Sequence, residues 1–279
     1  AGAGGAPLLL VHGWPETKRI WWRNIGPLAE AGFEVIVPDL RGYGESGLAP
    51  DGFYDLAAHA RDLHALVHGV LGHASCAAAG GDLGGGVIQD LGLRFAGFVE
   101  RQCLFNTILP LLPEAYAAAG LPADVPPEVR QAADYFVRQG RDADGLAAEL
   151  RSDAERRRYV AQFYGSRFWA TPGAFAREDV DFMAEPFADA AKLRAGWGNY
   201  ESALGTIPLS EPPRFFEPNP VETLVLYGPD DHVIWRDFPE RCEVAFPNAV
   251  GPFVVPRAGH FLQWERAELL NRALAAFMR

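Results

Sequence analysis

The sequence has few cysteines and no long apolar run. Its three cysteines, Cys76, Cys103 and Cys242, are an odd number, and two of them lie in strand-like segments. They are therefore predicted to be buried free thiols in a reducing compartment, not a disulfide framework. No apolar run approaches the ~20 residues of a membrane span, and no signal-peptide pattern is present. These absences predict a cytoplasmic protein without a membrane span.

Positive charge is also scarce, with 25 Lys and Arg residues against 36 Asp and Glu residues and a formal net charge of −11. Such a chain is a poor partner for nucleic acid or for an anionic membrane surface. With 49% hydrophobic and 22% charged residues among 279, the composition is that of a globular protein with a large core. The length suggests about two domains. Whether the protein forms a homodimer stays open at this point.

Motifs for nucleotides and metals are missing. The glycines at residues 80–86 do not fit G-x-G-x-x-G, and no Gly-Lys-Ser/Thr occurs, so nucleotide binding has no support. His64 and His68 are four residues apart on an expected helix. They lack a third ligand and the glutamate of a His-Glu-x-x-His motif, whereas a catalytic zinc needs three protein ligands. The sequence therefore predicts neither a cofactor nor a metal.

Short apolar runs alternate with helical periodicity in the first hundred residues. Strands are expected at residues 7–11, 34–40, 75–79 and 98–105, and helices at 21–31, 53–71 and after residue 82. The run P-L-L-L-V at residues 7–11 is apolar throughout, as in a strand buried on both faces. This alternation predicts an α/β fold, with a mostly parallel sheet and helices on both of its faces.

The alternation stops after residue 107, and only helices are expected up to about residue 216. They are placed at residues 128–139, 152–164 and 187–204, the second opened by the capping box Ser152-x-x-Glu155. Strands return at residues 223–228 and 252–257, before a terminal helix from about residue 262. The predicted domains are a core made of residues 1–107 and 216–279 and an inserted all-helical cap at 108–215.

Asp82 occupies the turn between a small-residue strand and a helix. The pattern Gly80-x-Asp82-x-Gly84 is typical of a nucleophile elbow with Asp where Ser is more common. Glycines two positions before and after the apex let neighbouring backbones approach it closely. The alternative is a glycine-rich turn in which Asp82 only caps the helix.

The whole chain resembles the α/β-hydrolase fold and, within it, the epoxide hydrolases. The resemblance rests on the motifs H-G-W-P-E at residues 12–16, D-L-R-G-Y-G-E-S at 39–46, the Asp82 elbow, Asn106, G-P-D-D-H-V at 228–233 and A-G-H-F at 258–261. Two features depart from the family pattern. Gly81 and Leu83 stand where the family usually has His and Trp. The family also has two strands before the first one here, so we expect a shorter sheet or a trimmed chain.

The order nucleophile, acid, base along the chain is the one expected of this fold. Asp231 and His260 both follow predicted strands, which places them at the carboxyl edge of the sheet with Asp82. His260 is predicted to be the base, and Asp231 to orient it and stabilise its charged form. Asp230 remains the rival acid, and His232 and His12 are rival bases.

An Asp nucleophile attacks carbon and forms an alkyl ester, which a water activated by His260 then hydrolyses. The resulting oxyanion needs backbone donors, expected at Leu83 after the nucleophile and, by the resemblance, at Trp14. The resemblance also implies two cap tyrosines that donate to the epoxide oxygen, here Tyr135 and Tyr200. Packing is the alternative role for both, and Tyr164 and Tyr116 are the alternative donors.

The resemblance implies a cofactor-independent epoxide hydrolase that converts a small apolar epoxide to a vicinal diol. A haloalkane or haloacid dehalogenase would use the same Asp nucleophile, but Leu83 cannot supply the side-chain donor that often holds the halide. A third interpretation is a binding protein that shares the fold and has lost catalysis. A complete Asp82, Asp231 and His260 set disfavours that interpretation.

Overall fold

The computed structural model describes residues 1–123 and 134–279. Within these ranges one sheet has six strands in the order β2-β1-β3-β4-β5-β6, and all neighbours are parallel. The strands are β1 (Ala6–Val11), β2 (Phe33–Ile36), β3 (Cys76–Gly81), β4 (Val99–Thr107), β5 (Glu222–Tyr227) and β6 (Ala249–Val254). The predicted α/β fold with a parallel sheet is confirmed.

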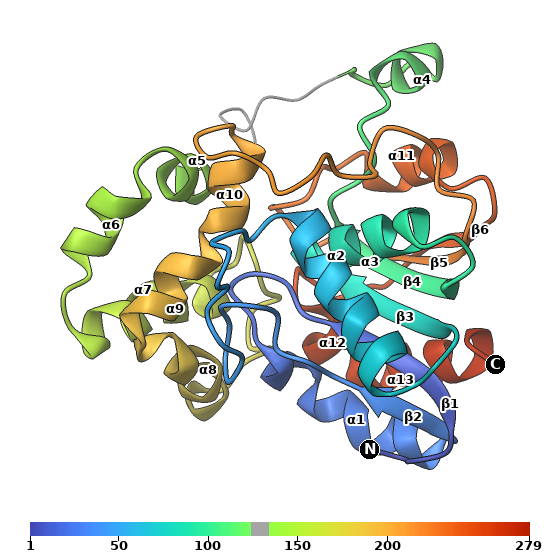
Figure 1. The fold of residues 1–279 in the computed structure, drawn as a ribbon, viewed down its shortest axis with the longest axis horizontal. Coiled ribbons are helices and arrows are strands. Elements are labelled where there is room, and N and C mark those ends of the chain that lie inside the picture. Colours follow the sequence, from blue (N-terminus) through green and yellow to red (C-terminus); the bar gives the residue numbers. More distant parts are fainter. Residues whose placement is uncertain (124–133) are drawn as a thin grey trace.

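The helices of the sheet domain form two groups (Figure 1). The first group contains α2 (Leu56–His64), its π-helical extension η2 (Ala65–Val70) and α3 (Asp82–Arg94). The second group contains the 3₁₀ turn η1 (Lys18–Trp21), α1 (Trp22–Glu30), α12 (Leu262–Glu265) and α13 (Ala267–Phe277). Helix α2 packs on α3, and α1 packs on α13. Helix α11 (Phe238–Ala245) contacts β5 and β6. No described helix is both long and apolar enough to cross a membrane.

The core explains the run of small and apolar residues around the central strands. Leu8, Leu9 and Leu10 of β1 are fully buried, because the sheet is covered on both faces. Helix α3 lies so close to β1 that a Cβ on Gly84 would collide with the carbonyl oxygen of Val11. The three cysteines are buried and free, as predicted.

Two predicted strands have different bounds in the structure. Strand β2 ends at Ile36 and does not continue to residue 40, because Pro38 has no N–H to donate to a neighbouring strand. Strand β6 is shifted towards the N-terminus and ends at Val254, shortly before Arg257 with φ +57°. That left-handed backbone conformation is incompatible with an extended strand.

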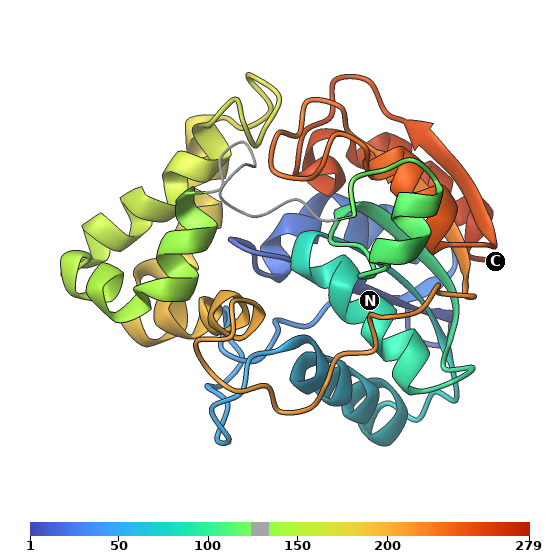
Figure 2. The same cartoon turned by 90° about the horizontal axis from the view of Figure 1, so that it is seen from above.

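Helices alone connect β4 to β5 among the described residues (Figures 1 and 2). They are α4 (Pro113–Ala118), α5 (Asp134–Arg141), α6 (Ala143–Glu149), α7 (Asp153–Gly165), α8 (Arg177–Ala184), η4 (Glu185–Ala188), α9 (Ala190–Gly196) and α10 (Gly198–Ala203). The first of them packs against α11, and the others lie to one side of the sheet. The predicted capping box of Ser152 and Glu155 opens α7. The start of the helix expected at residues 128–139 lies outside the described residues.

The single helix expected at residues 187–204 is wrong, because the segment is divided into η4, α9 and α10. Asp189 has an extended backbone, and its carboxylate accepts the N–H of Ala191 at 2.9 Å. An aspartate that caps one helix necessarily ends the preceding one. A second break at Trp197, between α9 and α10, places Tyr200 on a short separate helix.

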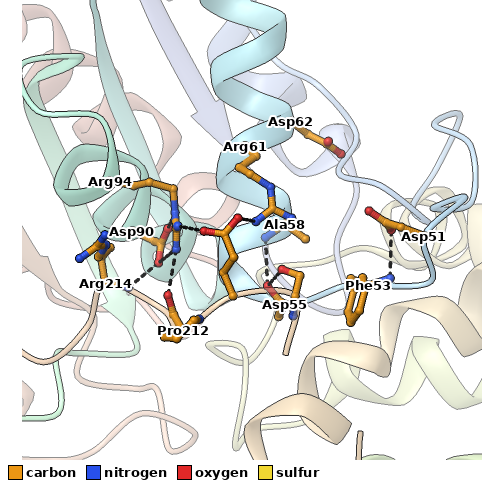
Figure 3. A network of polar contacts seen from close by, with 12 residues as sticks. Asp51, Phe53, Asp55, Ala58, Arg61, Asp62, Asp90, Arg94, Pro212 and Arg214 are labelled. Atoms are coloured by element: carbon orange, nitrogen blue, oxygen red, sulfur yellow. Dashed lines mark hydrogen bonds and ion pairs between the residues drawn. The ribbon is translucent and has the colours of Figure 1, made fainter. Parts of the chain in front are cut away.

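A polar network fastens the segment that returns from these helices to the sheet domain (Figure 3). Buried Asp90 of α3 accepts Arg94 Nε at 2.7 Å and the backbone N–H of Arg214 at 2.6 Å. Arg94 also donates to the carbonyl of Pro212 at 3.0 Å. Asp55, the cap of α2, accepts the Ser210 N–H at 2.6 Å. The return segment therefore binds directly to α3, the helix that begins at Asp82.

Candidate active site

Asp82 lies at the apex between β3 and α3, in the left-handed backbone region with φ +46°. Non-glycine residues rarely adopt this conformation, and it is held here by neighbouring contacts. Thr107 at the end of β4 donates its hydroxyl to the Asp82 carbonyl at 2.5 Å. The Asp82 side chain is 12% exposed, so a carboxylate is presented in a largely buried site.

Gly81, the residue before the nucleophile, lies opposite Phe105 where β3 pairs with β4. A Cβ on Gly81 would lie 2.5 Å from the Phe105 ring and 2.8 Å from the Phe105 carbonyl oxygen. The aromatic ring thus occupies the space that a side chain at position 81 would need. This packing is a physical reason for glycine at position 81, where the epoxide hydrolases usually have His.

Asp82, His260 and Asp231 come together as the sequence predicts. His260 Nε2 lies 3.3 Å from Asp82 Oδ2, and His260 Nδ1 lies 2.8 Å from Asp231 Oδ2. The imidazole and the Asp231 side chain are fully buried. The ring therefore lies between two carboxylates, with one nitrogen directed at each.

This arrangement determines the charge of His260. Burial lowers the pKa of the imidazole, but the Asp231 carboxylate, and then Asp82, outweigh it and raise the pKa well above its usual value. A charged imidazole between two carboxylates is stabilised by both. Both carboxylates therefore favour the charged imidazolium, and any step that neutralises Asp82 lowers the pKa of the ring, so that it gives up its proton more readily.

The Asp231 carboxylate and the loop around it are held by residues whose roles the sequence did not indicate. Asp231 Oδ1 accepts the N–H of Val233 at 2.7 Å. Asn106, at φ +40° in β4, donates to Asp231 Oδ2 at 2.8 Å and accepts the Gly228 N–H at 2.8 Å. It also donates to the Gly259 carbonyl at 3.2 Å. One buried amide thus links the acid loop to the loop that carries His260.

One of the two predicted backbone donors, the N–H of Trp14, binds the Asp82 carboxylate. The Trp14 N–H donates to Asp82 Oδ1 at 2.7 Å. Leu83 is the second residue of α3, and the N–H groups of a first helical turn have no acceptor within the helix. Asp82 Oδ1 therefore lies against the Trp14 N–H, and Oδ2 lies on the side of His260.

Tyr135 and Tyr200 meet above the Trp14 loop in one aromatic cluster. Their ring centroids are 5.8 Å apart, and each lies 5.6 Å from the Trp14 ring. Trp169 joins Tyr135 at 4.9 Å and contacts His260 edge-on at 4.7 Å. Burial, and then the proximity of Tyr135 and Asp82, raise the pKa of Tyr200 well above its usual value. Its hydroxyl is therefore a protonated donor at neutral pH.

The alternative residues lie elsewhere or are occupied. His12 binds the Gly13 carbonyl and the Leu40 N–H through its two ring nitrogens, and burial lowers its pKa. The rival acid, Asp230, accepts the Thr171 hydroxyl at 3.0 Å. The rival base, His232, lies edge-on to Phe168. The alternative tyrosine donors are also engaged, since Tyr164 donates to Pro15 and Tyr116 donates to Pro110.

Glu16 is a buried carboxyl group next to the three central residues. Its Oε2 accepts the Gly13 N–H at 2.6 Å, and its Oε1 accepts Gln263 Nε2 at 2.8 Å. Burial, opposed by the Gly13 N–H and assisted by the nearby Asp82, raises the pKa of Glu16 to about 7. Glu16 therefore titrates near neutral pH and links the Trp14 loop to the helix after His260.

Glu16→Gln is expected to flatten the dependence of stability on pH. A folded-state pKa of about 7 against an ordinary 4.5 means that the folded protein binds more protons than the unfolded chain between these values. The Glu16 contribution to stability is then fully present below pH 4.5 and is lost as pH rises to 7. Urea unfolding at several pH values measures this slope in both proteins. Identical slopes would contradict the assignment.

Comparison with known proteins identifies the family. The model of the alpha/beta hydrolase fold matches residues 6–267. The chain is similar to the soluble epoxide hydrolase of Corynebacterium sp. (strain C12), with 31% identity over 203 residues, 72% of this chain and 66% of that protein. The match thus spans just under two thirds of that relative. AB hydrolase superfamily protein YfhM of Bacillus subtilis (strain 168) is 26% identical over all of this chain and 92% of its own length.

Among solved structures, epoxide hydrolase CorEH without ligand superposes on the chain with a TM-score of 0.81. The superposition covers 98% of this chain and 91% of that one at 23% identity, which supports the shared fold. The family model, the relatives and the parallel six-stranded sheet agree with the fold predicted from the sequence. The chain therefore belongs to the α/β-hydrolase fold family and is a hydrolase of that fold.

Proposed function

We propose that this protein is an epoxide hydrolase that opens a small apolar epoxide to a vicinal diol without a cofactor. The proposal rests on one observation: the His260 ring lies between the Asp82 and Asp231 carboxylates, next to the aromatic cluster in which Tyr135 and Tyr200 meet. An aspartate at the elbow forms an alkyl ester, and phenol hydroxyls suit an oxygen leaving group. Relatives named epoxide hydrolases support the same reaction.

In the first step, Asp82 Oδ2 attacks an epoxide carbon and the carbon–oxygen bond of the ring breaks. Oδ2 is the attacking atom because Oδ1 is already bound by the Trp14 N–H. The released alkoxide is stabilised by the hydroxyls of Tyr135 and Tyr200, one of which supplies its proton. The product of this step is an ester whose carbonyl oxygen, Oδ1, faces the backbone donors.

In the second step, water attacks the ester carbonyl and His260 takes the proton. Esterification removes the charge of Asp82, one of the two carboxylates that raise the pKa of His260. The ring therefore loses its own proton more readily in the intermediate than in the resting enzyme. The oxyanion that forms on Oδ1 is stabilised by the N–H groups of Trp14 and Leu83. The proton that the ring gave up restores the tyrosine, and the proton taken from water restores the imidazolium. The departing oxygen takes the second proton of the water, so the diol leaves and the Asp82 carboxylate is restored.

Residues 108–215 act as a cap in this proposal, and residues 1–107 and 216–279 as the core. The aromatic cluster combines Trp14 of the core with Tyr135, Phe163, Trp169 and Tyr200 of the helical part. Such a lining excludes water and favours apolar substrates. Tyr200 reaches this cluster from α10 and Tyr135 from α5.

The function is tested with a panel of small apolar epoxides and matched haloalkanes. The expected result is vicinal diol from at least one epoxide, without added metal or cofactor. Halide release without diol formation would assign the protein to the dehalogenases instead. Absence of turnover on both classes, with a folded protein, would favour a binding protein that shares the fold.

Tyr135→Phe and Tyr200→Phe are each expected to slow alkylation of Asp82 by roughly 10- to 1000-fold, the range for a lost general acid or oxyanion donor. Binding of an apolar substrate should change little, because the rings and their contacts with Trp14 remain. Rapid-quench measurement of the covalent enzyme gives the alkylation rate directly.

Tyr116→Phe is the matched control for these variants. It also removes a buried hydroxyl, but that hydroxyl donates to the Pro110 carbonyl at 2.7 Å. Its alkylation rate should equal that of the wild type. Wild-type rates in the Tyr135 and Tyr200 variants as well would mean that these two residues serve only packing.

A further inference from the structure

A loop of the helical part, residues 168–171, touches both catalytic loops through its backbone. The Trp169 carbonyl accepts the backbone N–H of His260 at 2.6 Å, and the Phe168 carbonyl accepts the N–H of His232 at 2.9 Å. His232 directly follows Asp231. Consecutive carbonyls of one loop thus hold the base itself and the residue after the acid.

Thr171, the last residue of this loop, adds contacts to the same two loops. Its hydroxyl donates to Asp230, the residue before the acid, at 3.0 Å. Its N–H donates to Glu265 Oε2 at 3.0 Å. Glu265 lies on α12 and also accepts the N–H groups of Gly259 at 2.9 Å and Phe261 at 3.0 Å, one on each side of His260. We call residues 168–171 together with Glu265 the clamp.

We propose that the clamp is a positioning element that sets the orientation of His260 towards the Asp82 ester, with Glu265 as its key residue. This inference rests on the proposed hydrolysis of an alkyl ester. The backbone of His260 is held on three successive residues, by Glu265 at Gly259, by Trp169 at His260 and by Glu265 at Phe261. The helical part therefore contributes to the second chemical step as well as covering the substrate.

The geometry around the ring supports this role. The Trp169 ring lies edge-on to the imidazole at 4.7 Å, so Trp169 contacts His260 through its ring as well as through its backbone carbonyl. His260 lies 2.8 Å from Asp231 and 3.3 Å from Asp82, so a small rotation of its loop would lengthen one of these distances. Displacements of about 1 Å in a catalytic site can cost on the order of 100-fold in rate.

Both carboxylate oxygens of Glu265 accept backbone N–H groups, and this makes Glu265→Gln a sharp test. A glutamine has the same shape but only one acceptor oxygen, and its NH₂ group must face N–H donors on one side. An amide nitrogen that faces Phe261 replaces one hydrogen bond of the clamp by a repulsive contact. An amide nitrogen that faces Gly259 and Thr171 replaces two. The loop of His260 must then shift.

Glu265→Gln is expected to slow hydrolysis of the alkyl-enzyme by about 10- to 100-fold while alkylation changes less than about twofold. The first step uses Asp82 and the tyrosines, whereas the hydrogen bonds changed in this variant go to Thr171, Gly259 and Phe261. The covalent enzyme should therefore accumulate during turnover, as seen by intact-protein mass spectrometry. Glu268→Gln on the neighbouring α13 is the control, because Glu268 is exposed.

A second measurement does not depend on the substrate. The proton between His260 Nδ1 and Asp231 is buried, and it should give a far-downfield proton NMR resonance in the wild type and in Glu268→Gln. We expect this resonance to shift or to be lost through exchange in Glu265→Gln. If the wild type hydrolyses no epoxide, the proposed function fails, and the resonance still decides whether the clamp orients His260.

Thr171→Val completes the test in case Glu265→Gln does not fold. It keeps the Thr171 N–H to Glu265 but removes the hydroxyl that binds Asp230. A severalfold slower hydrolysis with unchanged alkylation is expected. Wild-type hydrolysis and an unchanged resonance in every folded clamp variant would overturn the inference. Equal slowing of both steps would also overturn it, since that would indicate a general structural defect.

Discussion

Asp82→Asn is expected to lower turnover by roughly 10⁴- to 10⁶-fold, the range for loss of a residue that acts within a catalytic triad. The amide is a poor nucleophile, and it also removes the charge that faces His260 Nε2 at 3.3 Å. The apex should still form, because the Thr107 hydroxyl binds the Asp82 backbone carbonyl and not its side chain. Initial rates of diol formation, together with circular dichroism to confirm folding, measure this effect.

The wild-type enzyme allows a more direct test of the same nucleophile. With enzyme in excess, one turnover in heavy-oxygen water should yield diol without the label, because the transferred oxygen is Asp82 Oδ2. Water then enters at the ester carbonyl, so Asp82 should carry the label afterwards. Diol from a second turnover should begin to contain it. Peptide mass spectrometry locates the label, and peptides without Asp82 are the internal control.

Label in the diol at the first turnover would contradict this mechanism. It would mean that water attacks the epoxide directly, with Asp82 as a general base. The fold assignment would still hold, because it depends on the family match and not on the label.

His260→Gln is expected to stop the reaction after alkylation, before the ester is hydrolysed, with steady-state turnover reduced by roughly 10⁴- to 10⁶-fold. Alkylation should survive because Asp82 Oδ2 attacks without a base, whereas the ester then has no group to activate water. The variant should gain the mass of one substrate molecule, on the peptide that carries Asp82. Intact-protein and peptide mass spectrometry measure both effects.

His68→Gln is the matched control for this experiment, since it removes an exposed imidazole from η2 whose ring contacts His64 and Phe98. It should turn over substrate and show no lasting mass increase. If His260→Gln is folded and binds substrate but remains unmodified, the two steps are not divided between Asp82 and His260 as proposed.

The short-range patterns in the sequence predicted most of the fold. The strand at residues 7–11, the elbow at Asp82 and the capping box at Ser152 all depend on a few consecutive residues, and each is present. The helix expected at residues 187–204 failed because its apolar spacing continues through a cap at Asp189 and a break at Trp197. Periodicity alone does not distinguish one helix from several aligned ones.

The sequence by itself determined which groups meet at the carboxyl edge of the sheet. Parallel strands bring residues that follow them to one edge of the sheet, so Asp82, Asp231 and His260 could be assigned from their places after strands. Only the tertiary structure decided how these groups are held. The Asn106 amide contacts the acid and base loops across 125 and 153 residues of chain, and Glu265 joins the base loop to Thr171 across 94 residues. The Trp169 carbonyl likewise binds the His260 N–H from a separate segment. Contacts of that kind leave no local pattern in the sequence, because they depend on how separate elements pack, and packing is specified by the whole core at once.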